Sequence, residues 1–98
     1  MTTRRRAGPD LFAGDVGQAV IEALREDNPE LEVRDWGAYL RASAPERCVL
    51  RRATVERRLG GPFTLPGDLE RIMPSCRGRI SIAQDEVVWS AETREAAK

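Results

Sequence analysis

The chain has 98 residues, with 16 Lys and Arg against 16 Asp and Glu, and 41% of its residues are hydrophobic. These values describe one small globular domain, because a chain of this length buries only about 60 to 68% of its unfolded surface and has room for a single modest core. The sequence contains no His, which excludes Ser-His and Cys-His nucleophile pairs and histidine-bound zinc or iron.

The two ends of the chain have little apolar content. Residues 1–7 and 91–98 are expected to form a flexible N-terminal arm and a flexible C-terminal tail around one domain over residues 8–90. Cys48 and Cys76 fit no CxxC spacing and are expected to be buried, reduced thiols. No apolar run approaches the ~20 residues that span a bilayer, and the start, MTTRRRAGPD, lacks the apolar stretch of a secretion signal. We therefore expect a cytoplasmic protein that makes no contact with a membrane.

The first predicted elements are a short apolar stretch at Leu11-Phe12 and a helix that begins at Asp15. Asp15 followed by Gln18 has the spacing of a capping box. Apolar residues at spacings of three and four predict the buried face of this helix: Val16, Ala19, Val20, Ala23 and Leu24. The helix is expected to end before Pro29, because proline disfavours helical geometry at the preceding residue.

Alternating apolar and polar residues predict strands over 30–35, 38–43 and 47–50. A second helix over 54–59 is expected to stop at Gly60-Gly61-Pro62, because glycine commonly ends a helix and proline cannot continue one. Phe63 and Leu65 follow in a loop that is expected to plug the core.

The last third of the chain is predicted to be extended over 69–73 and to form strands over 78–82 and 86–90, joined by the turn 83–85. Taken together, the elements indicate an α+β fold. We expect a small single domain in which two helices pack on a mostly antiparallel sheet, built from two βαβ-type halves.

Candidate residues for chemistry are few. Asp10 with Asp15, and Glu22 with Glu26, could serve acid–base work or bind a hard cation, although carboxylates on a solvated helix face are the commoner arrangement. The sequence has no phosphate-binding glycine motif. We therefore expect no cofactor, no metal and no catalytic residues.

Charge is distributed unevenly along the chain. Residues 10–35 carry eight acids against two Arg, whereas residues 36–82 carry nine Arg against four acids. This asymmetry favours docking on a charged protein, although a surface on which the charges pair with one another has the same pattern. Four arginines around the second helix could instead bind nucleic-acid phosphates: Arg51, Arg52, Arg57 and Arg58. A small Arg-patch module that binds nucleic acid or protein is the alternative, although no aromatic residue interleaves with these arginines.

Several short motifs occur in order along the chain. They are Gly8-Pro9 with Ala13-Gly14-Asp15, AVIEALREDNP (19–29), GAYLR (37–41), LGGPF (59–63), DLE (68–70) and PSCRGRI (74–80). Together they resemble the effector, or coupling, proteins of bacterial multicomponent soluble di-iron monooxygenases. The resemblance is nearest to the effectors of the toluene and alkene monooxygenases, and it extends from about residue 8 to residue 89.

The resemblance implies a cofactor-free regulatory protein that docks on the hydroxylase component over its di-iron centre. Such effectors tune substrate and oxygen access, electron transfer from a ferredoxin or reductase, and turnover, without catalysis of their own. The expected partners are therefore the hydroxylase and, indirectly, the ferredoxin or reductase, with no nucleic acid and no membrane.

The same resemblance places one segment against the hydroxylase, near the entrance to its active site: Ile72, Met73, Pro74, Ser75, Cys76, Arg77, Gly78 and Arg79. Ser75 and Gly78 keep the family pattern, whereas Ile72 stands where Asn is common and Cys76 where an aromatic residue or Thr is usual. Large side chains at Ser75 and Gly78 are expected to weaken docking and to leave thermal unfolding nearly unchanged.

Overall fold

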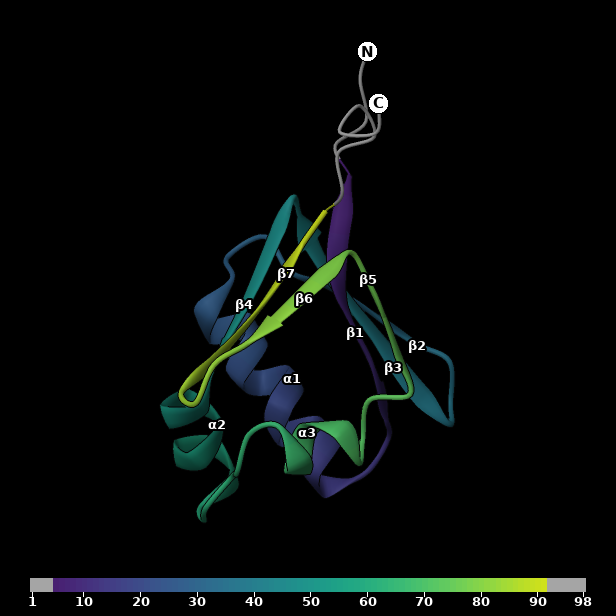
Figure 1. Ribbon diagram of the computed structural model, residues 1–98. Coiled ribbons are helices and arrows are strands. Elements are labelled where there is room, and N and C mark those ends of the chain that lie inside the picture. The colour runs from purple at the N-terminus through teal and green to yellow at the C-terminus, as the bar shows by residue number, and fades with distance from the viewer. Residues whose placement is uncertain (1–4, 92–98) are drawn as a thin grey trace.

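The structure is a computed structural model, and it describes residues 5–91 (Figure 1). The α+β class predicted from the sequence is confirmed, with three helices and seven strands in this range. In chain order the elements are β1 (Arg6–Phe12), α1 (Asp15–Asp27), β2 (Glu32–Asp35), β3 (Tyr39–Pro45), β4 (Arg47–Arg51), α2 (Arg52–Leu59), α3 (Gly67–Glu70), β5 (Ser75–Arg77), β6 (Arg79–Ile82) and β7 (Glu86–Ser90).

The strands form two antiparallel sheets rather than the single sheet expected. The first sheet has the strand order β2-β3-β1-β5, and the second has the order β4-β7-β6. In the first half of the chain, β1 and β2 lie on either side of β3 and pair antiparallel with it. In the second half, β4 and β6 lie on either side of β7 in the same way. The two expected βαβ-type halves are therefore present, with β3 between β1 and β2 and β7 between β4 and β6. The second half also contributes β5 to the edge of the first sheet.

Helix α1 packs against α2 and β4 through the apolar stripe that the sequence predicts. Val20, Ala23 and Leu24 have no exposed surface. The loop residue Phe63 is 1% exposed, as expected for a side chain that plugs the core, and Trp89 of β7 is fully buried. Burial of these large apolar side chains is the main driving force for holding the helices on the sheets.

The start of α1 differs from the prediction by one residue. Gly14 is the N-cap, with φ 142°, and no side chain caps the helix. Asp15 lies instead in the first turn, where its carboxylate interacts favourably with the positive end of the helix dipole. The predicted capping box is therefore wrong, although the helix it marked is present.

The prediction of an extended chain over 69–73 is also wrong, because the one-turn helix α3 occupies part of this range. Asp68 accepts a hydrogen bond at Oδ2 from the Thr64 backbone N–H at 2.7 Å, and its own N–H donates to the Thr64 carbonyl at 2.9 Å. This local turn chemistry overrides the apolar pattern, and the turn places Leu69 in the core.

Strand β1 extends into the expected N-terminal arm. Ala7 has no exposed surface and pairs with Ala44 of β3, so Arg6 and Ala7 belong to the folded domain. Residues 1–4 of the expected arm and residues 92–98 of the expected tail lie outside the described residues.

Candidate docking surface

The segment from Ile72 to Arg79 runs along one edge of the first sheet and then enters the second sheet (Figure 1). It is attached to β1 from its start, because the Phe12 N–H donates a hydrogen bond to the Ile72 carbonyl at 2.8 Å. The middle of the segment forms β5, an edge strand that pairs antiparallel with β1 and consists of Ser75, Cys76 and Arg77. The eight residues expected to contact a partner therefore form one continuous border of the molecule.

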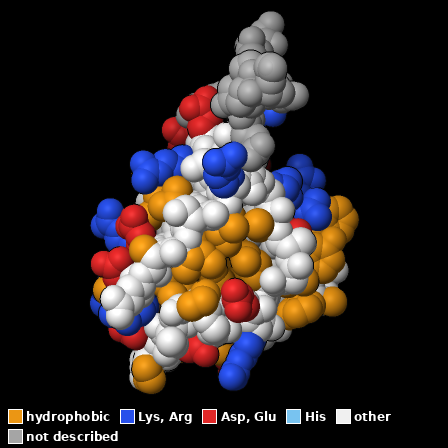
Figure 2. Space-filling model, in the orientation of Figure 1, with side chains coloured by type: hydrophobic (Ala, Val, Ile, Leu, Met, Phe, Trp, Pro, Cys, Tyr) orange, Lys and Arg blue, Asp and Glu red, His pale blue; other side chains and the backbone are white. Residues whose placement is uncertain are grey.

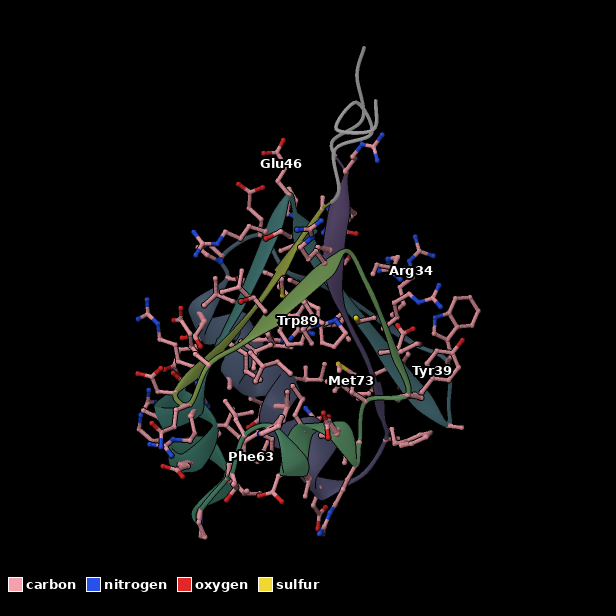
Figure 3. All side chains as sticks on the ribbon, in the orientation of Figure 1. Arg34, Tyr39, Glu46, Phe63, Met73 and Trp89 are labelled. Atoms are coloured by element: carbon pink, nitrogen blue, oxygen red, sulfur yellow. The ribbon has the colours of Figure 1, made fainter. Side chains whose placement is uncertain are left out.

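Half-buried apolar side chains gather beside this segment. Ile72, Met73, Cys76 and Ile80 pack against the core and keep part of their surface exposed. Figure 2 shows hydrophobic side chains together in the middle of the visible face, and Figure 3 shows Met73 in the same region. We call these four residues the apolar patch.

The outer side of β5 is held to the sheet by the buried carboxylate of Asp10, which is 5% exposed. The Ser75 hydroxyl donates to Asp10 Oδ2 at 2.7 Å, and the Arg41 Nε donates to Asp10 Oδ1 at 3.0 Å. Arg77 completes the cluster with an ion pair to the same carboxylate at 4.0 Å. The Asp10 carboxylate raises the pKa of the Arg41 guanidinium. Asp10 is therefore a structural anchor for β5, and not one half of an acid–base pair with Asp15.

Gly78 links β5 to β6 in a conformation that side chains rarely adopt. Its φ is +93°, and a Cβ built there would lie 2.5 Å from the Ser90 carbonyl oxygen. The expectation that a large residue at Gly78 would leave unfolding unchanged is therefore wrong, because its Cβ would clash with the backbone of Ser90 in the neighbouring strand β7. Ser75 likewise serves the fold through its hydrogen bond to Asp10.

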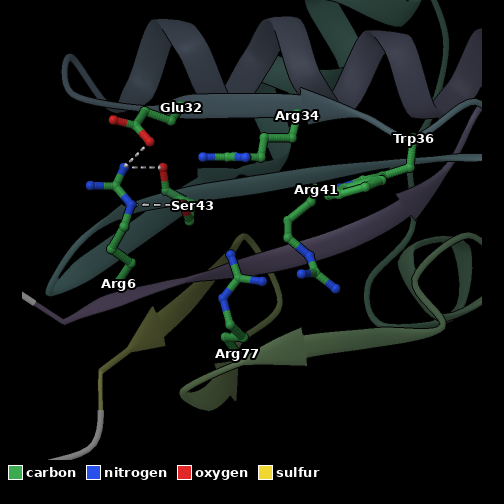
Figure 4. A pocket seen from close by; sticks show the side chains of 7 residues that line it. All are labelled: Arg6, Glu32, Arg34, Trp36, Arg41, Ser43 and Arg77. Carbon is green, nitrogen blue, oxygen red and sulfur yellow. Dashed lines mark hydrogen bonds and ion pairs between the residues drawn. The ribbon is translucent and has the colours of Figure 1, made fainter.

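A groove with a volume of about 340 Å³ opens on the outer face of the first sheet (Figure 4). One arginine reaches it from each strand of the sheet, and the lining residues are Arg6, Arg34, Arg41 and Arg77, with Glu32, Ser43 and Trp36. We call it the arginine groove. This site was not predictable from the sequence, because the four arginines are far apart in the chain and meet only through the order of the strands.

Aromatic side chains lie at one end of the groove. Trp36 is 54% exposed, and its ring stacks on Tyr39 with the ring centroids 6.4 Å apart. Phe12 is 48% exposed and lines a smaller pocket with Tyr39 and Arg41. The outer face of the first sheet therefore combines positive charge with exposed aromatic surface, a composition that is enriched in protein interfaces.

The arginine cluster around α2 is partly neutralised. Arg57 and Arg58 both donate hydrogen bonds to the Glu26 carboxylate. These bonds lower the pKa of Glu26 to about 2. The Arg51 backbone N–H donates to Asp27 Oδ2 at 3.0 Å. Because acids of α1 lie against these arginines, the cluster does not form the open basic track that phosphate backbones require.

Within residues 5–91, Cys, Asp and Glu side chains do not gather in a group of three or more that could hold a metal ion. No helix in this range has both the length and the hydropathy to cross a bilayer. Cys48 and Cys76 are free thiols; Cys48 is buried, as expected, and Cys76 is half-buried. The side chains of the surface described here are suited to binding a protein.

An apolar patch beside an arginine-rich sheet face defines a small α+β docking protein. The chain belongs to the MmoB/DmpM family, whose sequence profile matches residues 5–90. It is 40% identical to the effector subunit of the alkene monooxygenase system of Xanthobacter autotrophicus, in an alignment of 84 residues that covers 84% of this chain and 82% of that one. The effector resemblance read from the motifs is thereby confirmed.

Solved structures share the fold. A chain of the phenol hydroxylase–regulatory protein complex superimposes with a TM-score of 0.74 at 26% identity, covering 87% of this chain and 100% of that chain. Regulatory protein B of soluble methane monooxygenase superimposes with a TM-score of 0.70 at 18% identity, covering 96% of this chain and 70% of that chain.

Proposed function

We propose that this chain is the effector component of a bacterial soluble di-iron monooxygenase that oxidises an alkene or an aromatic hydrocarbon. The observation that carries the proposal is the 40% identity to an alkene monooxygenase effector subunit over 84% of the chain. The hydroxylase component supplies the di-iron centre and the oxidation chemistry, whereas this chain is non-catalytic. It acts in the cytoplasm, where its free thiols, Cys48 and Cys76, stay reduced.

The chain docks on the hydroxylase through the segment from Ile72 to Arg79. Two features of this border support the proposal: the apolar patch is partly exposed, and the polar side chains of Ser75 and Arg77 in β5 lie next to it. An apolar centre with a polar rim is the usual composition of a protein interface. The rigid attachment of β5 to β1 presents these side chains in a fixed arrangement, which lowers the entropy cost of binding.

Docking regulates the hydroxylase by a population shift. A bound protein moves its partner between two conformations only to the extent that it binds one of them more tightly. A tenfold change in the conformational equilibrium requires a difference of about 1.4 kcal/mol in binding free energy, which a few contacts of the apolar patch can supply. Substrate and oxygen access, electron transfer and turnover then follow the conformation that the effector favours.

The proposal is tested by adding the purified chain to the hydroxylase and reductase components of its own system and measuring product formed and reductant consumed. We expect turnover and coupling to rise and to saturate with added chain. Met73→Gln should raise the concentration needed for half-maximal activation by about tenfold, because it places a polar group in the apolar patch.

Ile82→Gln is the matched control, because Ile82 is an exposed apolar residue of β6 outside the docking segment. It should activate like the unmodified chain. Unchanged turnover and coupling at saturating amounts of the unmodified chain would contradict the proposed function. Equal effects of the two variants would contradict the assignment of the docking segment.

A further inference from the structure

The arginine groove is crowded with positive charge. In the pairing of β2 with β3, Arg34 lies directly opposite Arg41, and like charges at directly opposed positions destabilise a sheet. Arg41 is partly compensated by Asp10, at 3.0 Å. The Arg34 side chain makes no hydrogen bond or ion pair with any of residues 5–91. Among the described residues, the exposed guanidinium group of Arg34 on edge strand β2 therefore has no carboxylate partner.

The acids around the groove do not balance its arginines. Arg6 lies 3.8 Å from Glu32 in an ion pair and donates hydrogen bonds to the side chain and carbonyl of Ser43. Among residues 5–91, the ion-pair partner of Arg77 is the buried Asp10 carboxylate, at 4.0 Å, which also accepts a hydrogen bond from Arg41. Four guanidinium groups thus face two carboxylates, leaving a local charge of +2 on a chain whose net charge is zero.

The spread of these charges indicates the shape of the occupant. Adjacent strands lie about 4.8 Å apart, so four strands distribute the arginines over roughly 15 Å. This span exceeds a single small anion, and it suits an extended peptide in which carboxylates on alternate residues stand about 7 Å apart. Guanidinium groups bind carboxylates in paired, directional hydrogen bonds. Figure 4 shows Arg6, Arg34 and Arg77 directed toward the same space, with Trp36 at one end.

We infer that the arginine groove binds an acidic, extended segment of the hydroxylase, with carboxylates paired to Arg34 and its neighbours and an apolar side chain against Trp36. The inference rests on the proposed function and names the chemistry of the partner surface. Arg77 belongs both to the groove and to the segment from Ile72 to Arg79. The groove is therefore continuous with the segment from Ile72 to Arg79, and one partner that covers the β5 edge can contact both.

The first test compares the affinity of Arg34→Gln and Arg25→Gln for the hydroxylase, from about 20 to about 300 mM NaCl. Arg25 is an exposed arginine of α1 outside the groove, so it controls for a change in net charge alone. We expect Arg34→Gln to weaken binding roughly fivefold at low salt and to reduce the salt dependence, because one desolvated charge pair is lost. Arg25→Gln should leave the affinity and its salt dependence unchanged.

The second test uses a hexaglutamate peptide and the fluorescence of Trp36, since the only other tryptophan, Trp89, is fully buried. Hexaglutamate should change the emission in a salt-dependent manner and compete with the hydroxylase. Trp36→Phe should abolish the change in emission, and Arg34→Gln should weaken binding of the peptide. Hexaglutamine is the uncharged control.

Identical affinities and salt dependences for Arg34→Gln and Arg25→Gln, in a chain that still activates the hydroxylase, would overturn the groove assignment and leave the proposed function intact. Tighter groove binding of a single-stranded oligonucleotide than of hexaglutamate would also overturn it. If the unmodified chain neither bound nor activated the hydroxylase, the proposed function and this inference would both be wrong.

Discussion

The Asn28 side chain is both a hydrogen-bond donor to and an acceptor from the backbone of Val49. Its Nδ2 donates to the Val49 carbonyl at 2.7 Å, and its Oδ1 accepts from the Val49 N–H at 2.8 Å. Nδ2 also donates to the Leu24 carbonyl at 2.9 Å. One buried amide therefore joins the C-terminal end of α1 to β4 and connects the two halves of the fold.

Replacing this amide should destabilise the protein strongly. Asn28→Ala leaves the N–H and carbonyl of Val49 without their side-chain partners, whereas the Leu24 carbonyl keeps the Asn28 backbone N–H. We expect a loss of about 2–3 kcal/mol in the free energy of unfolding. Urea unfolding measures this value. Gln18→Ala, at an exposed position of α1, should change it by less than about 0.5 kcal/mol. Equal losses in the two variants would show that Asn28 has no special role.

The ion pairs of Glu26 with Arg57 and Arg58 predict a specific dependence on pH. They lower the Glu26 pKa from 4.5 to about 2. Because the pKa is lower in the folded state, the stabilisation is fully present above pH 4.5 and is lost as the pH falls toward about 2. Glu26→Gln should therefore be less stable than the unmodified chain at neutral pH, and the difference should disappear near pH 2.

Unfolding of both proteins across this pH range checks the prediction, with Glu22→Gln on the same helix as the control. Because these side chains are partly exposed, added salt should also reduce the difference. A difference that stays constant with pH would mean that Glu26 acts through packing instead of charge.

Gly78 should tolerate no side chain. Gly78→Ala places a Cβ 2.5 Å from the Ser90 carbonyl oxygen at a φ of +93°, and we expect it to cost about 1–3 kcal/mol of stability. Gly61→Ala is the matched control, because a Cβ there meets no atom within 4 Å. The melting temperatures of the two variants provide the comparison, and similar values for both would refute the close approach of Gly78 to the Ser90 carbonyl.

The two thiols should differ in reactivity. Burial raises the pKa of Cys48 to about 12 and leaves none of its surface exposed, whereas Cys76 is half-buried in β5. At about pH 8, a thiol reagent should label only Cys76 in the native chain, because the thiolate is the reacting form. Saturation with the hydroxylase should slow this labelling.

Cys76→Ser should show no rapid labelling until denaturant is added. Rapid labelling of Cys48 in that variant would contradict the position of β4 in the core. Unchanged labelling of Cys76 in the saturated hydroxylase complex would argue against contact at β5.

Elements with strong local patterns were predictable from the sequence. The stripe around Val20 identified α1, the Gly60 stop identified the end of α2, and the turn 83–85 identified the last hairpin. The short motifs also identified the family. These features depend on residues that are close in sequence, where periodicity and turn chemistry are informative.

Features that depend on distant pairing were not predictable. The strand β5 has three residues and is defined by its pairing with β1, which lies more than 60 residues earlier in the chain. The hydrogen bond from Ser75 to Asp10, for example, joins residues that are 65 positions apart. The division into two sheets and the arginine groove have the same cause. Arg6, Arg34 and Arg77 become neighbours only once the strand order β2-β3-β1-β5 is known.

The most direct test of the account is amide hydrogen exchange of the chain, alone and saturated with its hydroxylase. We predict slower exchange in the complex over the segment from Ile72 to Arg77 and around the arginine groove, with exchange of α2 unchanged. Slowed exchange confined to α2 and β4, or no change at saturating hydroxylase, would contradict docking through the face of the first sheet.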